Sequence, residues 1–218
     1  MEIQADVLFK KDNSGRMTEL NEPIFSPAPL FFLGRTREGS ILRFSVSFPK
    51  IILNEVIKMV NQNSENPDIG KIVSCINKVN DISNIWMGPA YIFPEDFNRI
   101  SSATKITNEN KGALLSHFPN LLIQFEWRQP IFATIENGKA VSVCCSARMN
   151  EKAAEASVET LEEYRGKGYA MECTIAWAKE IHKKGCHALY STAWDNFRSQ
   201  AIAKKLNLYQ YGMNLHMS

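Results

Sequence analysis

The stretch VETLEEYRGKGYAMECTIAWAKEIHKKG, residues Val158 to Gly185, decides how the chain folds. A β-branched run leads into a loop with two glycines and two cations, and an amphipathic pattern follows. Apolar residues recur at helical spacing between Met171 and Ile181, and Gly185 after two lysines ends the pattern. The stretch therefore predicts a strand and a helix, joined by a loop from Arg165 to Ala170.

This loop has the features of an anion site. The first residues of a helix leave backbone N–H groups without partners and carry the positive end of the helix dipole. The nucleotide-binding pattern G-x-x-x-x-G-K-[ST] is absent, and no third glycine follows Gly166-Lys167-Gly168 to complete the dinucleotide pattern. The pattern that does fit is Arg-x-x-Gly-x-Ala, formed by Arg165, Gly168 and Ala170.

The elements around the loop form a regular series. Residues 131–149 read as two β runs joined by Asn137-Gly138, the pair that a type I′ turn requires. A third run over residues 153–161 leads into the loop. After the helix come a strand over 186–194, a helix capped by Asp195-Asn196 and a last strand over 208–217. The predicted order is β-β-β-loop-α-β-α-β.

The N-terminal part predicts short strands and two packing helices without a phosphate motif. One helix follows Pro49, and the other has Asn66 as its cap and Pro67 at its first position. Residues 85–95 read as a strand with a Gly-Pro interruption, and residues 106–120 as a short helix that Pro119 ends. We therefore expect an accessory α+β segment over residues 1–95 and a second domain over 96–218.

With a strand before it and an amphipathic helix after it, the Arg-x-x-Gly-x-Ala motif resembles the coenzyme A loop of the GNAT N-acetyltransferase superfamily. A second landmark agrees, because WDNFRSQAIAKKLNLYQYG, residues 194–212, resembles the family's Asn-x-x-[Ala/Ser] helix start. The resemblance covers residues 130–218 closely, whereas residues 1–120 match only loosely the N-terminal extensions of bacterial GNAT proteins. It implies an α/β (α+β) fold with a mixed, mostly antiparallel sheet flanked by helices, behind an N-terminal α+β extension.

The same resemblance implies a site for acetyl-CoA as co-substrate, with no metal. The loop amides would bind the pyrophosphate, and the backbone of the preceding strand end would pair with the pantetheine arm. Two side chains on the last helix would line the opposite wall. The implied residues are Thr160, Leu161, Arg165, Gly166, Lys167, Gly168, Tyr169, Ala170, Asn196 and Ser199. Each alone also fits an ordinary structural role, such as a solvated charge or a helix cap, and their joint order favours the family.

Acetyl transfer to an amine requires a neutral nucleophile, a thioester carbonyl held in place and a means of protonating the departing thiolate. Glu155 and Glu159 lie on one face of the predicted strand, and either is a candidate base or an exposed strand carboxylate. Many members of the family have a tyrosine that acts as general acid at the position where this chain has Ala203. Ser199, Tyr209 and Tyr211 are the nearby hydroxyls, and Tyr211 is preferred. Because the coenzyme A thiolate is only weakly basic, its departure without a general acid is the other alternative.

The prediction is an N-acetyltransferase that moves an acetyl group from acetyl-CoA to a primary amine by direct attack in a ternary complex. The alternative is a coenzyme A sensor or scaffold without catalysis, which the missing tyrosine keeps open. A phosphotransferase is disfavoured because no Ser or Thr follows the loop lysine to bind Mg²⁺.

Composition sets limits on location and partners. The 218 residues carry 25 Lys and Arg against 23 Asp and Glu, a balance that favours neither nucleic acid nor membrane as a partner. No signal-peptide pattern or long apolar run occurs, so a cytoplasmic location is expected. The five cysteines lack disulfide or zinc spacing and predict reduced, buried thiols. The acceptor is expected to be a small-molecule or peptide amine, and the protein a monomer or homodimer.

Overall fold

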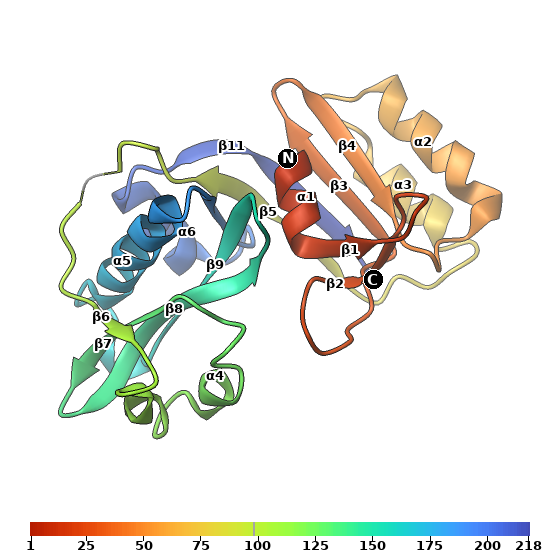
Figure 1. Cartoon of the computed structure of the whole chain (residues 1–218). Coiled ribbons are helices and arrows are strands. Elements are labelled where there is room, and N and C mark those ends of the chain that lie inside the picture. The colour runs from red at the N-terminus through yellow and green to blue at the C-terminus, as the bar shows by residue number, and fades with distance from the viewer. Residues whose placement is uncertain (98) are drawn as a thin grey trace. The chain divides into compact units, whose positions relative to one another are not determined.

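A computed structural model describes residues 1–97 and 99–218 of the chain (Figure 1). These residues form two compact units, which the chain enters more than once. Unit 1 contains residues 1–90, 192–196 and 210–218, and unit 2 contains residues 91–191 and 197–209. The expected domain boundary between residues 95 and 96 stays a prediction, because compactness does not test independent folding.

Unit 1 has its strands in the order β4-β3-β11-β5, with β3 antiparallel to both β4 and β11. Successive side chains of β3 point to opposite faces. Phe31 and Leu33 pack with helices α2 and α3, whereas Phe32 packs with α1 and β1. The elements are α1 (Glu2–Leu8), β1 (Phe9–Lys11), β2 (Met17–Leu20), β3 (Phe31–Thr36), β4 (Gly39–Phe44), η1 (Lys50–Ile52), α2 (Leu53–Gln62), α3 (Ile69–Ile76), β5 (Ile85–Ile92) and β11 (Tyr209–Met217).

Unit 2 has its strands in the order β10-β9-β8-β7-β6, where β9 and β10 are parallel and the other pairs antiparallel. Helix α5 lies on one face of this sheet (Figure 1). Its buried Trp177 packs in the core on that face, while Leu114 and Phe118 pack in a second core with residues of β7 and β8. The elements are β6 (Thr104–Ile106), η2 (Lys111–Leu114), α4 (Pro119–Ile123), β7 (Ile131–Glu136), β8 (Lys139–Met149), β9 (Ala153–Thr160), η3 (Glu162–Tyr164), α5 (Tyr169–Lys183), β10 (His187–Ser191) and α6 (Phe197–Lys205).

The predicted fold class is confirmed, since the sheet is mixed, mostly antiparallel and flanked by helices. The hairpin is also confirmed: Asn137 and Gly138 have φ values of 50° and 75°, and Glu136 faces Lys139 across the turn. Gly185, with a φ of 73°, follows the end of α5 as predicted.

Two predicted helix boundaries are wrong. Asp68, rather than Asn66, caps α3, and its side chain accepts a hydrogen bond from the Lys71 N–H. Pro119 does not end a helix but occupies the first turn of α4, where its missing N–H leaves no hydrogen bond unmade.

All five cysteines are buried with free thiols, as predicted. Burial raises the pKa of the Cys144 and Cys173 thiols, and raises that of Cys145 to about 11. None of the helices in the described part of the chain has both the length and the apolar character that a membrane span requires.

Strand β5 runs through Gly88-Pro89 without interruption, and a close backbone approach explains the glycine. The N–H groups of Thr192 and Trp194 donate to the carbonyls of Pro89 and Met87. A Cβ atom on Gly88 would lie 2.8 Å from the Ala193 Cα and even closer to the Thr192 carbonyl. Only a residue without a side chain fits between these hydrogen bonds.

Replacing Gly88 by alanine is therefore expected to lower the free energy of unfolding by about 1 to 3 kcal/mol. The backbone at Thr192 would have to move to admit the methyl group. Thermal unfolding followed by circular dichroism measures the loss. Gly70→Ala in α3 is the matched control, because its new Cβ would meet Asp68 at an ordinary 3.4 Å. Equal melting temperatures for Gly88→Ala and the parent would contradict the prediction.

Candidate active site

The loop from Arg165 to Ala170 exposes its backbone where α5 begins. Gly166 and Gly168 have φ values of 79° and 88°, in the left-handed region that favours glycine. Gly168 is the N-cap of α5 and provides no side-chain cap, and no atom lies within 4 Å of a Cβ built on either glycine. The first N–H groups of a 15-residue helix therefore open onto free space, as an anion requires.

Both cations of the loop lie at its surface. Arg165 forms an exposed ion pair with Glu162 at 3.1 Å, and such a pair contributes little to stability. The Lys167 ammonium lies 4.7 Å from the centroid of the Tyr164 ring and 6.0 Å from that of Tyr169. An arriving phosphate can therefore attract both cations without disturbing a buried contact.

Tyr169 joins the loop to the β7–β8 hairpin. Its hydroxyl donates to Glu136 Oε1 at 2.5 Å, and this hydrogen bond raises the pKa of Tyr169, because ionisation would place a phenolate beside a carboxylate. The sequence did not indicate this contact, since 33 residues separate the two side chains and Glu136 was predicted only to face Lys139. The bond fixes the start of α5 relative to the sheet.

The side of β9 that faces β10 is open near the loop. The two strands pair only over residues 153–155 and 187–189, although β9 continues to Thr160. Within the described residues, β9 therefore has no strand partner on this side from Ala156 on. The Leu161 N–H donates to the Val141 carbonyl of β8, so by alternation the backbone groups of Val158 and Thr160 point to the open side.

A family model for GNAT acetyltransferases matches residues 98–213, which is more than half of the chain. The chain belongs to the GNAT acetyltransferase family. The open edge of β9 and the glycine loop of α5 both lie inside the matched residues. The match supports an acyl-CoA N-acetyltransferase in general.

Solved GNAT structures share the fold at low sequence identity. A GNAT-family protein from Novosphingobium aromaticivorans has a TM-score of 0.53 and 13% identity over 63% of this chain and 66% of its own. An acetyltransferase from Colwellia psychrerythraea has a TM-score of 0.51 and 12% identity, covering 86% and 81%. A GCN5-related N-acetyltransferase-like protein from Streptococcus suis has a TM-score of 0.50 and 18% sequence identity, and the match covers 88% of this chain and 85% of that protein. The chain spans just under two thirds of the first of these proteins, and no curated protein matches it in sequence.

Unit 2 of this GNAT protein contains both candidate bases and the predicted coenzyme loop. Glu155 is only 4% exposed, and its Oε1 accepts a hydrogen bond from Ser191 Oγ at 2.5 Å. Glu159, on the same face of β9, is exposed. The Leu161 N–H and carbonyl are engaged by Val141 and Tyr164, so its predicted pairing with the coenzyme would have to replace these bonds.

The remaining predicted residues are divided between the two units. Tyr211 belongs to unit 1, where its hydroxyl donates to Gln4 Oε1 at 2.5 Å. Asn196 also belongs to unit 1 and directly precedes α6, while Ser199 lies in α6 and its carbonyl accepts from the Tyr190 hydroxyl. Within residues 1–97 and 99–218, no cluster of His, Cys, Asp and Glu side chains is arranged to hold a metal ion.

Proposed function

We propose that this GNAT protein transfers the acetyl group of acetyl-CoA to a primary amine of a small molecule or peptide, by direct attack in a ternary complex. One observation carries the proposal: the open edge of β9 leads directly into a glycine loop that exposes the N-terminus of α5. An extended, amide-containing arm that ends in a pyrophosphate is complementary to this combination.

In this proposal the coenzyme lies on unit 2, from the loop at the start of α5 along the open edge of β9. Its pyrophosphate binds the amides of Arg165 to Ala170, with Lys167 and Arg165 contributing positive charge. Its pantetheine arm pairs with Thr160 and Val158, whose backbone groups face the open side of β9. The thioester then lies toward the point where β9 and β10 separate, after Glu155 and Leu189. Ser199, in α6 of the same unit, also belongs to the coenzyme site in this proposal, while a role for Asn196 stays a prediction from the sequence.

No tyrosine stands at the position where many relatives have a general acid. Ala203, where many relatives have a tyrosine, is 1% exposed and packs in the core of unit 2. Tyr211 can donate a proton only after its hydroxyl leaves Gln4. These two observations favour departure of the thiolate without an acid, and they also favour the alternative of a coenzyme A sensor without catalysis.

A turnover screen distinguishes the enzyme from the sensor. The protein is incubated with acetyl-CoA and mixtures of primary amines, and release of free coenzyme A thiol is followed. The proposal expects thiol release that depends on both the amine and the protein. Calorimetric binding of acetyl-CoA without turnover on any amine class would favour the sensor, and absence of both binding and turnover would contradict the proposed function.

A further inference from the structure

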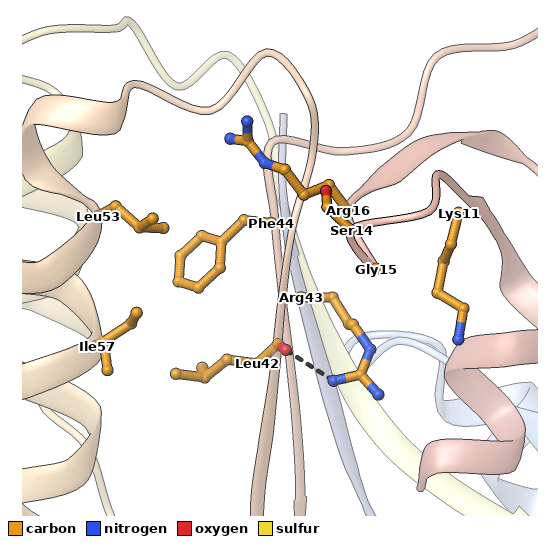
Figure 2. Close-up of a pocket in the computed structure, with 9 residues that line it drawn as sticks. All are labelled: Lys11, Ser14, Gly15, Arg16, Leu42, Arg43, Phe44, Leu53 and Ile57. Atoms are coloured by element: carbon orange, nitrogen blue, oxygen red, sulfur yellow. Dashed lines mark hydrogen bonds between the residues drawn. The ribbon is translucent and has the colours of Figure 1, made fainter.

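Unit 1 contains a hollow of about 500 Å³ at the edge strand β4 (Figure 2). Its lining comes from β4, from α2, and from the end of β1 with the β1–β2 connection, and it includes three cations but no acidic side chain. The lining residues are Lys11, Ser14, Gly15, Arg16, Leu42, Arg43, Phe44, Leu53 and Ile57. The GNAT family match begins at residue 98 and does not include any of them.

The backbone of β4 is open toward this hollow. β4 is the last strand in the sheet order, and over its own length it pairs with β3 alone among the described strands. Directly after β4, Ser45 forms a bridge with Met17 of β2, so the open edge ends at Phe44. The Ser45 N–H donates to the Leu30 carbonyl, so alternation turns Ile41 and Arg43 toward β3 and leaves Ser40, Leu42 and Phe44 facing the edge. Arg43 Nη1 donates to the Leu42 carbonyl at 2.9 Å, which agrees with this orientation, and an added strand has to replace this bond.

The side chains of β4 and α2 in the hollow are sorted by type across the strand, whereas the Arg16 guanidinium lies on the side of Phe44 and Phe48 (Figure 2). On one side of β4, Leu42 and Phe44 face Leu53 and Ile57 of α2, and on the other side Arg43 and Lys11 lie together (Figure 2). An extended chain added to this edge would send alternate side chains to these two sides. Apolar side chains would therefore meet the α2 side, and acidic side chains the cationic side.

The cations are within reach of a competing carboxylate. Lys11 pairs with Asp6 at 2.6 Å and Arg43 pairs with Glu2, whose side chain is 58% exposed. Arg16 donates to the Phe48 carbonyl at 3.4 Å and lies near Asp12. Surface ion pairs contribute little net stability, so an incoming carboxylate can take the place of Glu2 or Asp6 at small cost.

We propose that the β4 edge of unit 1 binds an extended peptide segment with alternating apolar and acidic residues, as an added β-strand. A second copy of this chain does not fit through its own β4, because it would bring Arg43 rather than a carboxylate to the cationic side. The site is separate from the proposed transfer site and does not require coenzyme A.

The test uses the full chain and a fluorescently labelled, blocked nine-residue peptide of alternating leucine and glutamate. Fluorescence anisotropy is expected to show saturable binding. Two further peptides carry N-methyl groups on all leucines or on all glutamates. In an antiparallel added strand, the pairing that β4 also makes with β3, the methyl groups of the first peptide point to β4 and those of the second point away from it. The first is expected to bind at least about tenfold more weakly, and the second to keep its affinity. Equal effects, or no saturable binding, would overturn the added strand.

Protein variants test the cationic side. Arg43→Glu and Lys11→Glu are each expected to weaken binding of the leucine–glutamate peptide by about tenfold and to improve binding of a leucine–lysine peptide. Lys78→Glu, an exposed cation of the same unit outside the hollow, is the matched control and should change neither affinity. Circular dichroism confirms folding of each variant, and Lys11→Glu carries the test where Arg43→Glu does not fold. Failure of the charge exchange, or equal loss with Lys78→Glu, would contradict the proposal.

Discussion

Replacing Gly168 by valine is expected to weaken acetyl-CoA binding by about two orders of magnitude or more. Gly168 has a φ of 88° and caps α5, so a β-branched residue would shift the loop backbone and place its side chain where the proposed pyrophosphate lies. Loss of two charge-assisted amide contacts, at roughly 1.5 to 3 kcal/mol each, accounts for the size of the effect. Isothermal titration calorimetry with acetyl-CoA measures it.

Gly185→Val provides a matched control at the other end of the same helix. Gly185 has a φ of 73° and, like Gly168, no atom within 4 Å of a built Cβ, so valine meets comparable backbone strain there. This variant should lose similar stability but bind acetyl-CoA like the parent. If folded Gly168→Val bound as tightly as the parent, the loop would not be the coenzyme site, although the family membership would stand.

The sequence predicted best those parts of unit 2 in which local signals agree. The Asn137-Gly138 pair requires positive φ values, and the structure shows them. The change from strand alternation to helical spacing at Gly168 coincides with the start of α5. At both places backbone preference and apolar pattern favour the same structure, so no information about distant residues was needed.

The errors arose where one residue type permits two roles. Pro119 is compatible with a helix end and with a first turn, and only packing of α4 decides between them. Asn66 and Asp68 can both cap, and the contact from Asp68 to Lys71 selects the second. Gly88-Pro89 resembled an interruption, but the glycine admits a neighbouring backbone segment that the sequence does not identify.

Contacts between distant residues limited the prediction of the site. The bond from Tyr169 to Glu136 and the engagement of Tyr211 by Gln4 join residues 33 and 207 positions apart. Unit 1 also takes residues 192–196 and 210–218 from the end of the chain, so its composition follows no single sequence boundary. Spacing rules describe neighbours along an element and carry no information about such partners.

If Glu159 is the general base, Glu159→Gln is expected to lower kcat by about 10² to 10⁴ with little change in acetyl-CoA affinity. Its carboxylate is exposed, so an amine or an intervening water can reach it. Glutamine keeps the shape of the side chain but cannot accept a proton. The measurement is kcat and the KM for acetyl-CoA, taken at one pH with an amine found by turnover.

Glu155→Gln is the matched comparison on the same face of β9. Glu155 is buried and bonded to Ser191, so its substitution should mainly lower the melting temperature and leave kcat nearly unchanged. A loss of kcat confined to Glu155→Gln at unchanged melting temperature would move the base to that residue. Full activity in both variants would show that neither carboxylate alone is required to remove the proton.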